Sequence, residues 1–327
     1  MTNFEVITKI GETLPSPARR EEPSGRPLLR VGAVQCAWDR DADRHKATLA
    51  EGIRLAANQG ASVICLQELT LSRYIAVRPD DRGAAQMMIE DLEQGPTAAF
   101  TRRMAAEVGA VVHASLYERD DNGPGFNTAI AVEPGGRVIA RTRKMHIPGF
   151  PYYHEDHYFA AGDTGFPVVD VNGVHFGFPT CWDQWFPELA RIYSLSGAEV
   201  LVYPTAIGSE PHLEGFDTEP LWRHMITANG LANATFMVAI NRIGSEGPLT
   251  FYGSSFISDP YGRVIVEASR DRPAVLVADL DLDQRRDWLT FGLMSTRRPD
   301  QYQQLVNSPH EGHATQAAQE ASPKGGA

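Results

Sequence analysis

Short apolar runs of strand length alternate along the chain with longer segments whose apolar residues recur every three or four positions. In residues 42–59, Leu49, Ile53 and Ala56 share one helical face, and Gly60 follows where a helix would end. The same pattern predicts helices at residues 97–108, 186–196 and 221–234. It predicts strands at residues 29–36, 62–66, 110–116, 126–132, 138–143, 167–171, 174–179, 199–203, 236–241, 253–258, 263–267 and 274–279.

Turn signals indicate that some neighbouring strands form hairpins, whereas others are joined by crossover helices. The hairpin signals are Asn122-Gly123, Pro134-Gly135-Gly136, Asn172-Gly173 and Asp259-Pro260-Tyr261-Gly262. A purely parallel nucleotide-binding sheet does not fit this pattern, and no glycine-rich phosphate loop follows the first strand. We therefore predict an α/β fold in which two mixed sheets pack face to face with helices outside.

The two ends of the chain differ in composition from the region between them. Residues 1–27 are polar and rich in proline, so we expect an extension outside the core, and residues 28–305 then form one domain. Residues 306–327 are rich in Ala, Gln, Ser, Gly and His and are typical of a C-terminal arm or a disordered tail. No secretory signal and no apolar run of about 20 residues is visible, so we expect a soluble cytoplasmic protein.

Composition and charge narrow the possible partners. The 327 residues are 43% hydrophobic and 22% charged, which excludes a collagen-like chain, a disulfide scaffold and wholesale disorder. The 30 Lys and Arg against 41 Asp and Glu give a net charge of −11, which argues against nucleic acid and anionic membranes as partners. Only Cys36, Cys65 and Cys181 are cysteines, and an odd, sparse set indicates a reducing compartment.

Cys181 is the strongest candidate for a chemical role. A predicted strand leads into it, and a helix begins a few residues later, so it would lie at a strand-to-helix turn beside free backbone N–H groups. Those N–H groups and the helix dipole would favour a thiolate and a nearby oxyanion. The alternative is that Cys181 is a small buried hydrophobe, which is the interpretation we adopt for Cys36 and Cys65 inside apolar strands.

Two further strands end in ionisable side chains. Glu68 follows the strand at 62–66, where partial desolvation would raise its pKa toward that of a general base. Lys144 follows the strand at 138–143 and could stabilise both a thiolate and an oxyanion. His175 lies inside a strand and points along the sheet, so it is a poorer base. Taken singly, Glu68 and Lys144 are better explained as solvated surface charges.

A loop rich in aromatic residues carries Glu155 between several histidines. His146, His154 and His157 could suggest a metal site, but the chain has no HExxH motif and no paired-cysteine spacing. Hydrogen-bonded histidines near the mouth of an active site are the simpler interpretation, and we predict no metal.

Three segments together resemble the nitrilase superfamily, the carbon–nitrogen hydrolases, over about residues 29–305. The segments are Leu66-Gln67-Glu68, Arg143-Lys144-Met145-His146-Ile147-Pro148 and Cys181-Trp182-Asp183-Gln184-Trp185-Phe186-Pro187-Glu188. The resemblance implies a Glu68–Lys144–Cys181 triad and a second glutamate at Glu155. It also implies an α-β-β-α sandwich that assembles as a homodimer or larger homo-oligomer, and a reaction without a cofactor.

Further segments are similar to the N-carbamoylputrescine amidase branch of that superfamily. They are Tyr203-Pro204-Thr205-Ala206-Ile207-Gly208-Ser209-Glu210-Pro211, Asn241-Arg242-Ile243-Gly244, Phe251-Tyr252-Gly253-Ser254-Ser255-Phe256 and Arg297-Arg298-Pro299. The similarity implies that Glu210 anchors a substrate ammonium group. The chain departs from the branch at residues 149–153, at His224 and at Asn229, and we expect these positions to line or support the substrate pocket.

The resemblance implies hydrolysis of an amide or ureido group, with release of ammonia. Cys181 would attack the carbonyl carbon, Glu68 would move the proton, and Lys144 with the Trp182 N–H would hold the oxyanion. We expect substrate contacts from Trp182, Glu210, Tyr74, His154 and Ala206. N-carbamoylputrescine or a related N-carbamoyl amine is the expected substrate. The alternatives are an N-carbamoyl amino acid, an aliphatic amide or a nitrile on the same triad, a metallohydrolase, and a non-catalytic binding protein on this fold.

Overall fold

The computed structural model describes residues 3–18, 20 and 25–306, and the chain divides into two compact units. The first unit spans Met1–Phe291 and holds every helix and strand discussed below. The second unit spans Gly292–Ala327, and its described part contains the short 3₁₀ helices η4 (Pro299–Gln301) and η5 (Gln303–Leu305). The tail expected at 306–327 lies outside the described residues apart from Val306.

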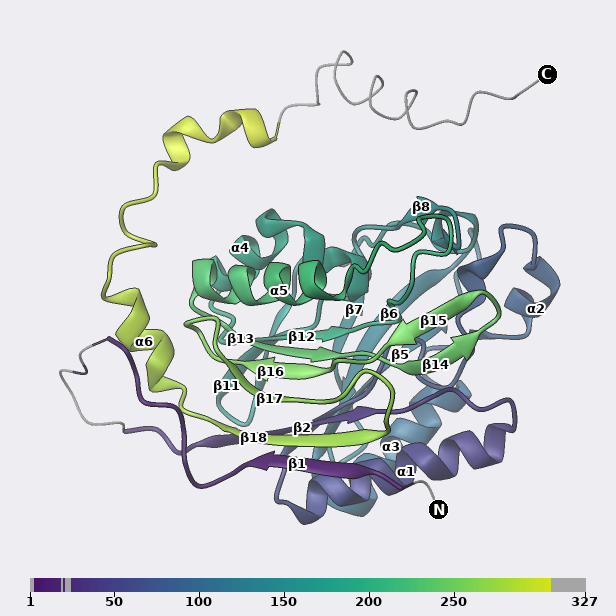
Figure 1. Cartoon of the computed structure of the whole chain (residues 1–327), viewed down its shortest axis with the longest axis horizontal. Coiled ribbons are helices and arrows are strands. Elements are labelled where there is room, and N and C mark those ends of the chain that lie inside the picture. The colour runs from purple at the N-terminus through teal and green to yellow at the C-terminus, as the bar shows by residue number, and fades with distance from the viewer. Residues whose placement is uncertain (1–2, 19, 21–24, 307–327) are drawn as a thin grey trace. The chain divides into compact units, whose positions relative to one another are not determined.

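One sheet contains the first and the last strand of the first unit (Figure 1). Its order is β1-β18-β2-β3-β5-β6-β7, with β4 paired to β5. The bounds are β1 Glu5–Lys9, β18 Ala274–Leu280, β2 Leu29–Gln35, β3 Val63–Cys65, β5 Val111–Glu118, β6 Phe126–Val132, β7 Val138–Arg143 and β4 Ile89–Glu90. The centre of the sheet, β2-β3-β5, is parallel, whereas β5-β6-β7 are antiparallel, so the sheet is mixed as predicted.

The second sheet has the order β10-β11-β12-β13-β16-β17. Its strands are β10 Val168–Val171, β11 Val174–Gly177, β12 Val200–Pro204, β13 Phe236–Ile240, β16 Phe256–Ser258 and β17 Val264–Glu267. The predicted Asn172-Gly173 turn joins β10 to β11, and both of its residues have positive φ, at 57° and 80°. Two small ribbons complete the unit, β8 (Gly149–Phe150) with β9 (Tyr153–His154) and β14 (Ile243–Glu246) with β15 (Leu249–Tyr252).

Helices cover the outer face of each sheet (Figure 1). Helices α1 (Ala42–Asn58) and α3 (Pro96–Val108) pack on the first sheet. Helices α4 (Pro187–Leu195) and α5 (Glu219–Asn233) pack on the second. Apolar residues from both sheets form one buried cluster between them, for which Val31, Leu276, Phe176 and Val238 are representative. This arrangement is the predicted four-layer α-β-β-α sandwich. Two short helices, α2 (Arg82–Gln86) and α6 (Asp283–Leu289), lie outside these layers.

The N-terminal residues do not all lie outside the core. Strand β1 pairs in parallel with β18, with Ile7 opposite Leu276, and Ile7 packs against the cluster between the sheets. Phe4 and Ile10 pack on the other side, against the cluster beneath α1 and α3. The strand was missed because it is short, half exposed and paired with a segment from the far end of the sequence. Among the described residues, no helix is both long and apolar enough to cross a membrane.

Candidate active site

Three strands of the two sheets lead toward one buried cluster of ionisable side chains. Glu68 lies three residues beyond the end of β3, Lys144 directly follows β7, and Cys181 lies four residues beyond β11. The exposed fractions of these residues are 0%, 1% and 5%. The structure therefore removes the alternative that Glu68 and Lys144 are solvated surface charges.

The ammonium of Lys144 lies between two carboxylates. Its Nζ is 2.9 Å from Glu68 Oε1 and 2.6 Å from Glu155 Oε2. Burial alone would lower the pKa of Lys144, but the charges of Glu155 and Glu68 outweigh burial and raise it. The Tyr74 hydroxyl donates to the other Glu155 oxygen at 2.9 Å. Lys144 is thus held as a cation in a fixed position.

Glu155 is a weaker acid than an ordinary glutamate. Burial raises the pKa of Glu155 to about 7, the Lys144 charge opposes that rise, and the Glu68 charge adds to it. Two carboxylates that share one ammonium in a buried site therefore favour retention of one proton near neutral pH.

The two oxygens of Glu68 have different surroundings. Oε1 accepts hydrogen bonds from Asn127 Nδ2 at 2.7 Å and from Lys144 at 2.9 Å. Oε2 is buried and accepts no hydrogen bond from the part of the chain that the structure describes. One oxygen is therefore fixed while the other keeps its lone pairs free, as a group that moves a proton requires.

Cys181 lies at a sharp turn. Its φ of 41° falls in the left-handed region, which is uncommon outside glycine and is found at strained functional turns. The turn is fixed by Asp183, whose carboxylate accepts from the Thr180 N–H at 3.0 Å and from the His146 N–H at 2.9 Å. The same carboxylate lies 2.8 Å from His146 Nδ1. Asp183 thus joins the Cys181 turn to the segment that follows Lys144.

The helix predicted at residues 186–196 is observed as α4 (Pro187–Leu195). A five-residue 3₁₀ helix, η3 (Cys181–Trp185), lies between the β11 end and α4, and Cys181 is its first residue. A 3₁₀ segment of this length has few aligned peptide dipoles, so Lys144 is the main source of positive charge near the sulfur.

The surroundings of Cys181 favour the protonated form of its thiol. Burial raises its pKa well above the usual value, and the charges of Glu68 and Glu155 add to the rise. Lys144 and a hydrogen bond from the Ala206 N–H act in the opposite direction. To act as a nucleophile, this thiol would need a base, and the free oxygen of Glu68 could serve as one. Cys36 and Cys65 lie in the core as expected, and burial raises the pKa of Cys36 to about 12.

The expected substrate contacts divide into two groups. Tyr74 and Ala206 lie at the triad through their hydrogen bonds to Glu155 and Cys181. Trp182 follows the cysteine, and its ring lies 5.0 Å from that of Phe150. Glu210 lies four residues after Ala206 and lines a neighbouring cleft.

His154 lies in a different group of side chains. Possible ligand atoms of His154, Asp156 and His157 lie within 4.8 Å of one another, and the last two residues are exposed. His146 does not belong to this group but pairs with Asp183 and stacks on Phe186 at 3.6 Å between ring centroids. The three histidines considered as a metal set are therefore not brought together as one.

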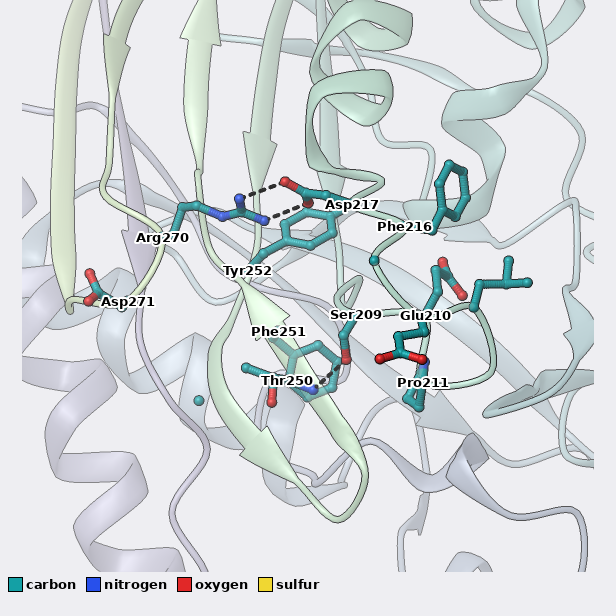
Figure 2. Close-up of a pocket in the computed structure, with 14 residues that line it drawn as sticks. Ser209, Glu210, Pro211, Phe216, Asp217, Thr250, Phe251, Tyr252, Arg270 and Asp271 are labelled. Atoms are coloured by element: carbon teal, nitrogen blue, oxygen red, sulfur yellow. Dashed lines mark hydrogen bonds and ion pairs between the residues drawn. The ribbon is translucent and has the colours of Figure 1, made fainter.

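The cleft beside Glu210 has a volume of about 770 Å³ (Figure 2). Its apolar walls include Phe251 and Tyr252, and its polar groups include Arg270 and Asp217. Burial raises the pKa of Glu210 to about 7. Oε2 of Glu210 is buried and has no hydrogen-bond partner among the described residues. A cationic group is the natural partner for such an oxygen.

The positions that depart from the N-carbamoylputrescine amidase branch lie in different parts of the structure. Residues 149–153 form most of the β8–β9 ribbon, where the Tyr153 hydroxyl accepts from the Gly208 N–H at 3.0 Å and donates to the Ser209 carbonyl at 3.2 Å. Asn229 is buried and donates to the Gln184 carbonyl at 2.9 Å, so it supports η3. His224 is exposed on α5, so the expectation that it lines or supports the pocket is wrong.

Two residues of the site were missed in the sequence. Asn127 in β6 fixes Glu68, and the only signal was an amide inside an otherwise apolar strand. Arg242 is 0% exposed, and its Nη2 donates to the Glu68 carbonyl at 2.6 Å. Nothing in the sequence around Arg242 shows that its partner lies 174 residues away.

Comparison with known proteins shows which proteins the chain is similar to. The family model described as carbon-nitrogen hydrolase matches residues 30–289. An N-carbamoylputrescine amidase from Arabidopsis thaliana is 39% identical over 290 residues, covering 84% of this chain and 94% of that protein. A citrullinase from Francisella tularensis is 35% identical over 285 residues, covering 85% and 98%. The crystal structure of a carbon-nitrogen hydrolase from Helicobacter pylori G27 superposes with a TM-score of 0.78 at 29% identity, covering 86% and 99%.

Proposed function

The chain belongs to the carbon–nitrogen hydrolase family, and from this premise we propose that it hydrolyses an N-carbamoyl amine with Cys181 as the nucleophile. The observation that carries the proposal is the buried Lys144 ammonium, which is shared by Glu68 and Glu155 beside the thiol. Such an arrangement holds a proton acceptor, a cation and a nucleophile together in a buried site.

The first half of the reaction forms a covalent intermediate. Glu68 takes the thiol proton on its free oxygen, and the Cys181 sulfur bonds to the carbonyl carbon of the substrate. The negative charge that develops on the carbonyl oxygen is stabilised by Lys144 and the backbone N–H of Trp182. Glu68 then returns the proton to the departing nitrogen, and the C–N bond breaks.

The second half regenerates the thiol. A water molecule attacks the carbonyl carbon of the thioester-like intermediate while Glu68 accepts its proton, and the C–S bond breaks as the sulfur is reprotonated. The released carbamic acid decomposes to carbon dioxide and a nitrogen base. Whichever nitrogen departs first, the sum is one ammonia, one amine and one carbon dioxide for each N-carbamoyl amine and water consumed.

Glu155 and Tyr74 act on Lys144 in this mechanism. The carboxylate of Glu155 holds the ammonium at 2.6 Å, and the Tyr74 hydroxyl holds the carboxylate at 2.9 Å. Because the ammonium is already oriented before substrate enters, it need not reorganise as the oxyanion forms.

The surroundings of Glu210 support the proposal that the substrate carries a cationic group. Its unpartnered, buried oxygen would bind the ammonium at the far end of N-carbamoylputrescine. The two relatives described above are named for N-carbamoylputrescine and for citrulline, and both compounds carry a ureido group and an ammonium group. Homo-oligomeric assembly and a cytoplasmic location remain predictions.

The test is release of ammonia and putrescine from N-carbamoylputrescine. We expect Cys181→Ala to lower kcat by at least about 10³-fold, because no other thiol lies at the site. Cys65→Ala is the matched control, since it removes a buried thiol from the cluster between the sheets, and it should keep kcat within about threefold. Wild-type turnover in Cys181→Ala, with unchanged unfolding temperature, would contradict the proposal.

A further inference from the structure

We propose that the cleft beyond Glu210 binds a second ammonium group, so that the preferred substrate is the N-carbamoyl derivative of a triamine. The inference rests on the proposed function. It extends the expected substrate from an N-carbamoyl amine whose aliphatic tail carries one ammonium to one whose tail carries two. Four observations carry it, namely the position of the cleft, its charge, its size and the saturated state of its arginine.

One segment of the chain connects Cys181 to the cleft. Ala206 donates its N–H to the Cys181 sulfur, and Ser209 and Glu210 of the same segment line the cleft. Four residues of chain span at most about 14 Å. The carbonyl carbon of N-carbamoylputrescine lies within about 8 Å of its ammonium by standard bond lengths. Under the proposed function Glu210 binds the ammonium of this tail, and a longer tail continues past Glu210 into the cleft that this residue lines.

The cleft carries an excess of negative charge. Its lining includes Glu210, Glu214, Asp217 and Asp271 against the single cation Arg270. Arg270 is already engaged, because its Nη1 and Nη2 lie 2.8 Å and 2.7 Å from the two oxygens of Asp217, as the dashed lines in Figure 2 show. Glu210, Glu214 and Asp271 form no ion pair within the described ranges 3–18, 20 and 25–306.

The size and walls of the cleft suit an aliphatic chain between two charges. At about 770 Å³ the space exceeds what the four-carbon tail of N-carbamoylputrescine fills. Leu213, Phe216 and Tyr252 supply apolar surface for methylene groups along its walls. An extended diamine segment can therefore lie against carbon while its end meets Glu214 or Asp271.

A zwitterionic tail fits the same cleft less well. The carboxylate of an amino acid such as citrulline would need Arg270, whose guanidinium is bound at both nitrogens by Asp217. The citrulline carboxylate would also be repelled by the other carboxylates that line the cleft. The charge of the cleft therefore favours a second cation over an anion.

The experiment compares three substrates with the full-length enzyme. The substrates are N-carbamoylputrescine, spermidine carbamoylated on its four-carbon arm, and citrulline, with ammonia release as the readout. We expect the triamine derivative to have a kcat/KM at least about fivefold higher than N-carbamoylputrescine. The ratio should fall as ionic strength rises from about 0.05 to 0.5 M, since salt screens exposed carboxylates.

Substitutions of the carboxylates in the cleft test whether these groups cause the preference for the triamine derivative. Glu214→Gln combined with Asp271→Asn should bring the ratio of the two kcat/KM values down toward one. Asp121→Asn removes one charge from an exposed turn outside the cleft and should leave the ratio unchanged. Hydrolysis of N-carbamoylputrescine with a ratio at or below one, or a preference for citrulline, would overturn the inference and leave the proposed function standing. Failure to hydrolyse any of the three would overturn both.

Discussion

At the scale of single residues, the site depends on carboxylates that burial keeps close to protonation. Burial raises the pKa of Glu155 and of Glu210 to about 7 in each case. Their tasks differ, because Glu155 holds a lysine whereas Glu210 faces a cleft. A group that binds a cation works only when it is ionised, so the proposed role of Glu210 would make substrate choice depend on the pH of the solution.

This connection predicts how specificity changes with pH. Below about pH 7 the free enzyme holds a proton on Glu210, so kcat/KM for N-carbamoylputrescine should rise as pH increases from 5.5 to about 7.5 and then level. N-butylurea has the same ureido group and carbon chain but lacks the ammonium. Dividing kcat/KM for N-carbamoylputrescine by kcat/KM for N-butylurea therefore cancels the effect of Glu155 titration and leaves the effect of Glu210 titration. Glu210→Gln should make this ratio independent of pH and lower it by about 10-fold or more. A ratio that stays flat with pH in the wild type would contradict the assignment.

At the scale of elements, the loop between Glu68 and Tyr74 is held by the β14–β15 ribbon. Arg242 donates from Nη2 to the carbonyls of Glu68 at 2.6 Å and Leu69 at 3.2 Å, and from Nη1 to Glu246 at 2.6 Å. The other oxygen of Glu246 accepts from the Tyr74 N–H at 2.7 Å. Leu69 has a φ of 47°, so the loop contains a strained position that these bonds stabilise.

We predict that Arg242 positions Glu68 for catalysis. Arg242→Lys keeps the charge but cannot form the fork of donors, so kcat should fall about 10- to 100-fold while KM changes little. Arg223→Lys replaces an arginine paired with Glu219 on the surface of the second sheet's helix layer, and it is the matched control. A fall in unfolding temperature without any fall in kcat would show that Arg242 contributes to stability alone.

The same elements show what the sequence could and could not predict. The strand ends that carry Glu68, Lys144 and Cys181 were found because a strand and its end are local patterns. The ribbons β8–β9 and β14–β15 were missed because two- and four-residue strands carry almost no periodic signal. Asn127 and Arg242 were missed because their roles come from partners that are distant in sequence and close in the fold.

At the scale of the whole first unit, the first and the last strand of its sequence complete one sheet of the sandwich. Strand β18 lies between β1 and β2, so the last strand of the sheet is covered on one edge by the first. All seven residues of β18 are buried, whereas β1 is half exposed. The short edge strand therefore protects a long apolar strand from pairing with other chains.

This arrangement predicts different costs for two adjacent aliphatic residues in β1. Ile7 packs against the cluster between the sheets, whereas Val6 is 40% exposed. Ile7→Ala should lower the free energy of unfolding by about 1–3 kcal/mol, because it removes methyl groups from a partly buried site. Val6→Ala removes similar groups from an exposed site and should cost less than about 1 kcal/mol. Urea unfolding followed by circular dichroism measures both, with kcat of Ile7→Ala as a check that the distant site is intact. Equal costs would mean that β1 does not pack against the core, and its place as a strand of the sheet would then be wrong.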